Sequence, residues 1–344
     1  MLPMRTALLP LLALPLLLTG FSRKADSIAL QPKSDLVLRK SFELTLESEK
    51  ETSEEDSEED SSMTTHQSSM TTLVVLDTII EADAERATHM QRVYEEVAIT
   101  REASMESGSN SDELITEGTC ALIGETLDFQ WDTDDESYAL SCEADVDLSE
   151  EPRFDLDLSE FLPEGEVDEG DSWGIEGQAF RDTVDFLAGL PIEWDDLVEP
   201  NAPSGSGHGS GSSTGEAGAP EEKHSTDGEV VFTYAGSRSI DDVLVAVISL
   251  KGEIETEDSL DSARSMEGHS FETHTSRNRT ATIEGELLWN IEGGHAHSLT
   301  IEITEETEGT VETIIDVGGQ QFGGESTTTG SGTRTINASY ELVE

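Results

Sequence analysis

The apolar residues of this chain recur at every second position over most of its length. The first clear run is carried by five residues on one face: Leu36, Leu38, Phe42, Leu44 and Leu46. A period of two places those side chains on one side of a half-buried β-strand, with polar residues on the other side. The pattern therefore predicts a mainly β protein.

Similar alternation continues in the second half, as in Ile283 to Ile291, Leu299 to Ile303 and Val311 to Ile315. Residues 243–250 (VLVAVISL) are continuously apolar and indicate a strand covered on both faces. Clean alternation favours antiparallel strands over parallel β–α–β units. We expect long antiparallel strands in two packed or curved sheets.

Helical spacing occurs in one short region. Phe180, Val184 and Leu187 fall at helical intervals, and Gly189 and Pro191 then supply stop signals. A further helical turn is expected over residues 154–162. We therefore expect one or two short helices that cover a sheet.

The first 22 residues have the composition of an export signal. Arg5 precedes an apolar run from Ala7 to Leu18, and small residues follow at Thr19, Gly20 and Ser22. Such a run is too short to span a bilayer comfortably. Residues 1–22 are therefore predicted to be a signal peptide, and the protein to be secreted or periplasmic, with no membrane insertion after cleavage.

Two segments of low complexity divide the rest of the chain. Residues 48–70 are acidic, lack apolar periodicity and predict a disordered loop, and residues 201–228 are rich in Gly and Ser. These boundaries give an N-terminal β-rich lobe over 23–200, a flexible linker over 201–228 and a C-terminal antiparallel lobe over 229–344. The linker either separates two domains or interrupts one continuous sheet.

Acidic residues outnumber basic ones throughout the chain. There are 75 Asp and Glu against 19 Lys and Arg, a formal net charge of −56. A surface of this sign repels nucleic acid and anionic membranes, and it attracts cations weakly and diffusely. Nucleic-acid partners are therefore excluded, and the specific partner stays open.

The chain has two cysteines, Cys120 and Cys142. In an oxidising compartment they could join neighbouring strands by a disulfide; the alternative is two free thiols. Neither lies in a CxxC pattern or beside a histidine that would indicate a nucleophile or a zinc site.

Residues 170–174 (GDSWG) match the G-x-S-x-G pattern that surrounds the nucleophile of many serine hydrolases. That arrangement needs a buried strand before the serine and a helix directly after it. Here an acidic, turn-rich segment precedes Ser172. We therefore interpret the match as a turn with Trp173 as a core residue, and a hydrolase that uses Ser172 ranks third among the functions considered.

Two patterns of metal-ligand type also have simpler interpretations. Asp132, Asp134, Glu136 and Glu143 follow the spacing of a calcium loop, but Ser137 replaces its glycine and the flanks indicate a β-hairpin. His295 and His297 could lie on one face of a strand, with His269 and His274 as the remaining candidate ligands. We assign no catalytic, cofactor-binding or metal-binding residue and expect no cofactor.

Two stretches resemble elements of uncharacterised exported β-rich bacterial proteins of the planctomycete type, some of them classed as domains of unknown function. They are residues 162–173 (LPEGEVDEGDSW) and residues 285–293 (GELLWNIEG). The resemblance implies a β-rich secreted or envelope protein and no known activity. More distantly, the chain is similar to the curved half-barrels of periplasmic lipid and lipoprotein carriers, in which a helix plugs the concave side of a bent sheet.

These observations leave two main hypotheses. The first is a non-catalytic, exported, acidic β-sheet protein with a binding or structural role in the envelope or outside the cell. The alternative is a periplasmic carrier of an apolar, lipid-like ligand. A carrier needs a concave cavity of several hundred Å³, about the size of small-molecule sites, whereas a structural protein needs only filled cores.

Overall fold

The computed structural model describes residues 26–54, 62–84, 86–107, 110–142, 152–195, 221–266, 269–317 and 320–343. The predicted signal peptide, most of the linker and Glu143 lie outside these ranges. The described chain is mainly β and antiparallel, which confirms the predicted class, but one large sheet replaces the expected pair.

Nine long strands form the body of this sheet, and the longest has 24 residues, against the five or six that are usual. They are β2 (Leu36–Glu54), β3 (Ser62–Ala82), β4 (Ala87–Ser107), β5 (Asn110–Cys120), β11 (Glu221–Ile240), β12 (Val243–Met266), β13 (His269–Asn290), β14 (His295–Val317) and β15 (Gln320–Leu342).

Six short strands and two short helices complete the described structure. They are β1 (Asp26–Ser27), β6 (Thr126–Asp132), β7 (Ser137–Cys142), β8 (Glu166–Val167), β9 (Ser172–Glu176), β10 (Ile192–Trp194), the 3₁₀ helix η1 (Ser159–Phe161) and α1 (Gly177–Thr183). Strands β1 and β8 pair with each other in a separate small sheet. Neither described helix is long and apolar enough to cross a membrane.

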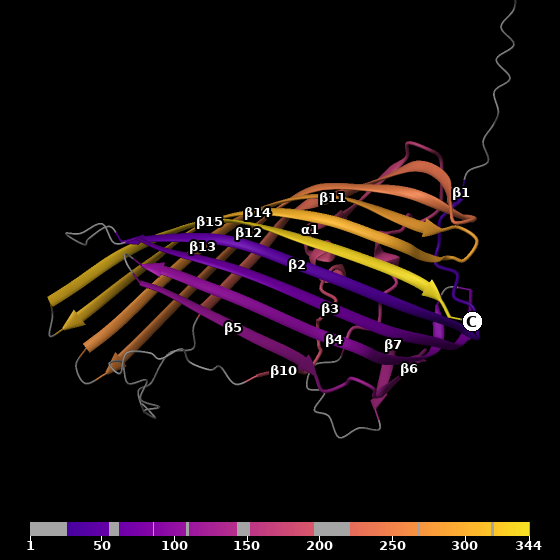
Figure 1. Cartoon of the computed structure of the whole chain (residues 1–344). Helices are drawn as coiled ribbons and strands as arrows, with labels where there is room; N and C mark the ends of the chain where they lie inside the picture. Colours follow the sequence, from indigo (N-terminus) through magenta and orange to yellow (C-terminus); the bar gives the residue numbers. More distant parts are fainter. Residues whose placement is uncertain are drawn as a thin grey trace, which may run out of the picture.

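The two halves of the sequence meet within the one sheet. Its order is β10-β5-β4-β3-β2-β15-β14-β13-β12-β11-β9, so that the last long strand pairs with the first one. Strand β6 pairs with β4, and β7 pairs with β6. Figure 1 shows the long strands side by side in one bent sheet. The segment expected to be a linker thus connects two parts of a continuous sheet.

The structure differs from the two segments that were expected to be unstructured. Strand β2 continues to Glu54 and β3 begins at Ser62, so that both flanks of the expected loop over 48–70 are strand. Strand β11 begins at Glu221, inside the expected linker over 201–228. These strand ends carry little apolar periodicity, and pairing with long neighbours extends them.

Residues 152–195 form a covering segment on the concave side of the sheet. Strand β9 pairs with β11 at one edge and β10 pairs with β5 at the other, so the chain between them crosses beneath the sheet. Helix α1 lies in this crossing, as Figure 1 shows. The predicted helix is confirmed over Gly177–Thr183, but Leu187 lies beyond its end.

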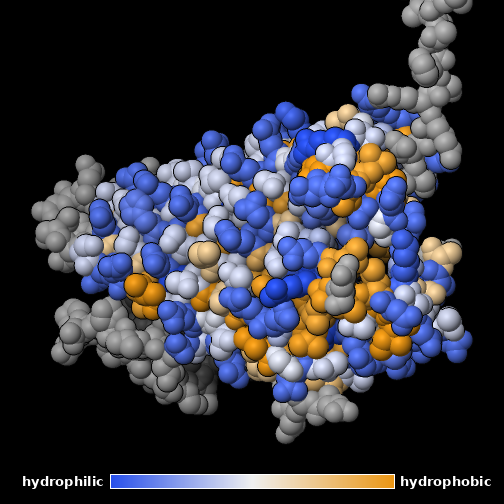
Figure 2. Space-filling model, turned by 45° about the vertical axis from the view of Figure 1, so that its right-hand side comes forward, coloured by the Kyte–Doolittle hydropathy of each residue, from blue (hydrophilic) through white to orange (hydrophobic). Residues whose placement is uncertain are grey.

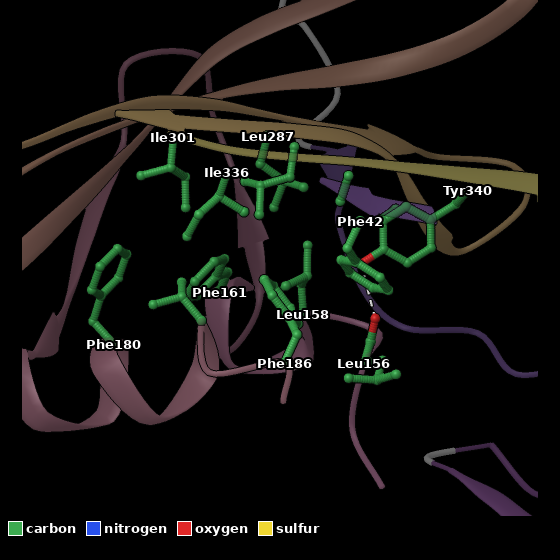
Figure 3. Packing of buried hydrophobic residues seen from close by; sticks show 14 of the residues in the cluster. Phe42, Leu156, Leu158, Phe161, Phe180, Phe186, Leu287, Ile301, Ile336 and Tyr340 are labelled. Atoms are coloured by element: carbon green, nitrogen blue, oxygen red, sulfur yellow. Dashed lines mark hydrogen bonds between the residues drawn. The ribbon is translucent and has the colours of Figure 1, made fainter. Parts of the chain in front are cut away.

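Apolar side chains fill the space between the sheet and the covering segment. Phe161, Phe180 and Phe186 point from the covering segment toward the sheet, and Ile301 and Ile336 point down to meet them (Figure 3). The rings of Phe42 and Phe186 lie 4.4 Å apart. Each such buried side chain contributes about 1.5–3 kcal/mol, so this layer holds the segment in place.

The sheet reaches well beyond the covering segment. We call its two ends the covered half, which contains the C-terminal ends of β3, β11 and β13, and the bare half, which contains the C-terminal ends of β2, β4, β12 and β14 (Figure 1). The described residues of 48–69, 257–280 and 304–332 contain no buried apolar side chain. Only the covered half therefore has a hydrophobic core.

Candidate functional site

Ser172 is the first residue of an edge strand and does not lie on a nucleophile elbow. A turn precedes it, in which the Asp171 amide bonds the Asp168 carbonyl oxygen, and α1 begins five residues later. Its hydroxyl is exposed and lies 2.8 Å from the Thr233 hydroxyl. Trp173 packs on Phe232 and donates to the Phe161 carbonyl, which gives it the expected structural contacts.

Of the residues with calcium-loop spacing, Asp132, Asp134 and Glu136 lie at the tip of the β6–β7 hairpin, and Glu143 lies outside the described residues. The carboxylate of Asp132 accepts the backbone N–H of Asp134 at 2.8 Å, so it is used to shape the turn. Among the described residues, no group of three His, Cys, Asp or Glu side chains is placed to hold a metal ion.

The four candidate histidines are not brought together. His295 is buried near the β13–β14 turn, where its Nδ1 lies 2.7 Å from the Ala296 carbonyl oxygen. His274 pairs with Asp261 and lies sixteen residues along β13 from Asn290, which is paired with His295. At the rise of a β-strand the two imidazoles are roughly 50 Å apart.

Both cysteines are free thiols in the structure. Cys120 is buried at the end of β5, and Cys142 is half-buried at the end of β7. The Leu122 amide lies 3.4 Å from the Cys120 sulfur, and burial raises the pKa of this thiol, which makes it a weak nucleophile.

A buried group of charged side chains is the main feature that sequence reasoning missed. Lys40, Asp77 and Arg92 are each at most 1% exposed, and they lie on β2, β3 and β4. The Lys40 ammonium lies 2.7 Å from Asp77 and 2.5 Å from Asp157 of the covering segment. The Arg92 guanidinium donates two hydrogen bonds of 2.7 and 2.8 Å to the Asp77 carboxylate.

These four residues, which we call the ionic cluster, fasten the covering segment to the sheet. Arg92 donates to the carbonyl oxygens of Arg153 and Phe154 at 2.6 and 2.8 Å, and Asp157 reaches Lys40. Tyr340 adds a buried hydrogen bond to the Leu156 carbonyl, drawn in Figure 3. The cluster thus joins three strands to the segment below them.

The charges in the ionic cluster stabilise one another against burial. Burial disfavours the Asp77 carboxylate, but Arg92 and Lys40 outweigh it and lower the pKa of Asp77 to about 2. Burial likewise opposes the charge on Lys40, yet Asp157 and Asp77 raise its pKa above the usual value. Burial raises the pKa of Asp157, which also faces Asp155 and Asp77. The opposite charges of the ionic cluster therefore offset the cost of their burial, and the cluster holds the covering segment on the sheet in a charged state.

The sequence did contain a signal for the ionic cluster. Lys40 is in phase with the inward-facing residues Leu38 and Phe42, and Asp77 is in phase with Val75 and Ile79. A charged residue within the apolar period of a strand must be paired to be tolerated inside a protein. The period alone could have marked both positions, although not their partners.

A hollow of about 1460 Å³ lies between the covering segment, the sheet and residues 29–32. We call it the large hollow. Its apolar lining includes Leu30, Leu36, Leu38, Tyr138, Phe154, Leu162, Trp173 and Ile175, and Asp155, Asp157 and His295 are among its polar residues. Figure 2 shows hydrophobic residues gathered on the covered half, at the right of the view, whereas the left-hand part of the molecule is mostly hydrophilic. The covering segment therefore leaves part of the concave side unfilled.

A second hollow of about 450 Å³ lies where α1 faces the sheet. Phe180 and Val184 contribute to its wall, together with residues of β2, β12, β13, β14 and β15. The concave side therefore has two spaces of the size that small molecules occupy.

No protein-family model matches this sequence, and no curated protein matches it significantly. Among solved structures, it is similar to Pseudomonas aeruginosa OpdQ, with 8% identity over 88% of this chain and 99% of that one, and a TM-score of 0.16. OccK7 (OpdD) of the same organism has 7% identity, covers 89% and 100%, and has a TM-score of 0.16. Scores this low carry no argument about fold or function.

Proposed function

We propose that this chain is an exported, non-catalytic binding protein that holds an apolar or amphiphilic small molecule against the concave side of its sheet. The large hollow carries the proposal, because its volume suits such a ligand and its lining combines apolar residues with polar ones such as Asp155, Glu160 and Glu164, as an amphiphile requires. Of the two sequence hypotheses, this favours the carrier over a purely structural role.

Location outside the cytoplasm is part of the same proposal. It is supported by the signal-like composition of residues 1–22 and by the resemblance of residues 162–173 and 285–293 to exported bacterial proteins. The strongly acidic surface keeps such a protein soluble in salty surroundings.

A polarity-sensitive dye tests the binding function directly. N-phenyl-1-naphthylamine should fluoresce strongly on addition of the full chain and saturate with a single class of site. Leu162→Arg places a charge in the lining of the large hollow and should weaken dye binding by about tenfold or more, since a charge is costly to bury against an apolar ligand.

The matched control is Leu244→Arg, because Leu244 is 41% exposed and lies outside the large hollow. It should bind the dye as the unmodified chain does. Equal dye affinity in Leu162→Arg and Leu244→Arg, or no saturable dye binding by the unmodified chain, would contradict the proposed function.

A further inference from the structure

The second hollow reverses the charge balance of the molecule. Its lining contains four basic residues and two acidic ones, Asp185 and Glu305, in a chain with 75 acidic and 19 basic residues. The basic residues are Lys50, Arg181, Arg279 and Arg334. We call this space the arginine hollow. A random sample of this surface would be strongly acidic, so the concentration of cations needs a reason.

Four different elements bring these cations together. Lys50 lies on β2, Arg181 on α1, Arg279 on β13 and Arg334 on β15. On the sheet, Arg334 stands opposite Ile303 and Arg279 stands opposite Thr307, both on β14. The covering segment then supplies Arg181 from below. The arrangement depends on strand register as well as on the covering segment.

Most hydrogen-bond donors of these arginines are not committed to protein partners. Arg279 bonds Asp258 through one terminal nitrogen, while its Nε is buried without a partner. Arg334 donates to the Val184 carbonyl at 3.2 Å. In the described part of the chain, the side chain of Arg181 makes no hydrogen bond or ion pair. Because each guanidinium has five donors, the arginine hollow holds unused capacity to bind an acceptor.

A buried hydroxyl lies next to the same group. Thr256 is fully buried on β12, directly opposite Arg279 in the strand register, and its hydroxyl has no partner. Buried polar groups are normally hydrogen-bonded, so this hydroxyl and the Arg279 Nε add unused hydrogen-bonding capacity beside the arginine hollow, although Thr256 is not part of its lining.

The positive charge of the arginine hollow is only partly compensated by acidic residues. Burial lowers the pKa of Arg181, and the nearby charge of Arg279 lowers it further, against the opposing effect of Glu305 and Asp258. Burial likewise lowers the pKa of Arg334, against the opposing effect of Asp185 and Glu305. An anion in this space would stabilise Arg181 and Arg334 in their charged form.

The remaining walls of the arginine hollow are apolar. They are formed by Leu46, Phe180, Val184, Ile254, Ile283 and Ile303. Leu46 is 37% exposed although it stands in phase with buried residues of β2, so a binding partner could still cover it. A ligand that fits both the cations and these walls has an acidic head and a hydrocarbon part.

We propose that the arginine hollow binds the carboxylate or phosphate head of a single-chain amphiphile, with Arg181 and Arg334 as the principal head-group contacts. Planar guanidinium groups recognise such anions through paired, charge-assisted hydrogen bonds. This inference rests on the proposed function, because it takes the concave side to bind amphiphiles, and it adds a second site, separate from the large hollow, for those with an acidic head. It also places the ligand's head group against the arginines and its hydrocarbon tail against the apolar wall of the arginine hollow.

The test compares ligands that differ only in the head group. The full-length protein is titrated calorimetrically with dodecanoate, dodecanol and inorganic phosphate. The three affinities separate the contribution of the charged head group from that of the hydrocarbon tail and from that of a free anion. Dodecanoate should bind at least about tenfold more tightly than dodecanol, because the head makes charge-assisted contacts that the alcohol lacks. Inorganic phosphate, which has no apolar part, should bind more weakly than dodecanoate.

The variant Arg181→Gln/Arg334→Gln should bring the affinity for dodecanoate down to that for dodecanol. Arg238→Gln is the matched control, because Arg238 is half-exposed, pairs with Glu286 and lies outside the hollow. It should bind both ligands as the unmodified chain does. Dye binding in the large hollow should stay unchanged in both variants, which shows that they are folded.

Three results would overturn the inference. One is equal affinity of the unmodified chain for dodecanoate and dodecanol, another is unchanged dodecanoate affinity in the double variant, and the third is phosphate binding as tight as that of dodecanoate. If the dye binds but the head group has no effect, only the anion site is wrong. If the unmodified chain shows no saturable dye binding, the proposed function is wrong, whatever the twelve-carbon ligands do.

Discussion

The covered half and the bare half consist of the same strands, yet different forces stabilise them. In the covered half, side chains such as Leu73, Ile301 and Ile336 are completely buried against the covering segment. In the bare half, the same strands carry Ser, Thr, Gly and Glu on both faces, and cross-strand polar contacts replace a core. One example is the pair of Thr52 and Thr328 hydroxyls, which lie 3.2 Å apart.

This difference shows that a strand can extend well beyond the segment in which apolar residues alternate with polar ones. Backbone hydrogen bonds and Thr-rich pleated surfaces extend the strands once a neighbour holds the register, although each cross-strand pair adds only about 0.2–1 kcal/mol. The covered half therefore sets the register, and the bare half follows it.

The largest difference between the halves should come from removing a carboxylate. Asp77→Ala leaves Arg92 and Lys40 buried with one partner fewer and should cost about 3–5 kcal/mol in the free energy of unfolding. Asp261→Ala, in the bare half, removes an exposed pair with His274 and should cost at most about 1 kcal/mol. Urea unfolding measures both, and equal costs would contradict the division into two halves.

Acid should weaken the ionic cluster in a defined pH range. The folded-state pKa of Asp77 is about 2, below its usual value of 3.8, so its stabilisation is present above pH 4 and is lost as the pH falls toward 2. This change is worth about 2 kcal/mol. The difference in unfolding free energy between the unmodified chain and Asp77→Asn should therefore shrink by that amount between pH 5 and pH 2. A constant difference would mean that Asp77 titrates normally.

A single methyl group gives the smallest comparison. Ile336→Val, at a fully buried position of β15, should cost about 0.5–1.5 kcal/mol. Ile315→Val makes the same change on β14 in the bare half, where the side chain is only partly buried, and should cost a few tenths of a kcal/mol at most. Thermal or urea unfolding of the two variants measures the loss of unfolding free energy in each. A larger loss for Ile315→Val than for Ile336→Val would indicate an unrecognised core in the bare half.

The strands of the covered half could be predicted from the sequence because apolar residues recur in them at every second position. Residues 48–54 and 221–228 lack that period, and their strand structure comes from partners such as residues 326–332 of β15. Local composition cannot report pairing between residues almost 280 positions apart. The same limit applies to the arginine hollow, because nothing in the sequence near Arg181 shows that Arg334 will lie beside it.

The ionic cluster falls between these cases. Lys40 and Asp77 interrupt an apolar period, which a reader of the sequence can see, but Asp157 belongs to a segment without any regular pattern. The helix around Phe180 lies where it was predicted but ends about one turn earlier than Leu187, because the chain leaves the helix at Val184 to reach the opposite edge of the sheet.

The edges of the sheet have a consequence for the protein in bulk solution. Strand β9 covers only Glu229–Thr233 of β11, and β10 covers only Gly118–Cys120 of β5, so long stretches of backbone at both edges have no described strand beside them. Open edges of this kind can add strands from another copy. A net charge of −56 keeps copies apart in the way that charge stabilises a colloid. When acid or multivalent cations neutralise that charge, we expect the chains to assemble edge to edge.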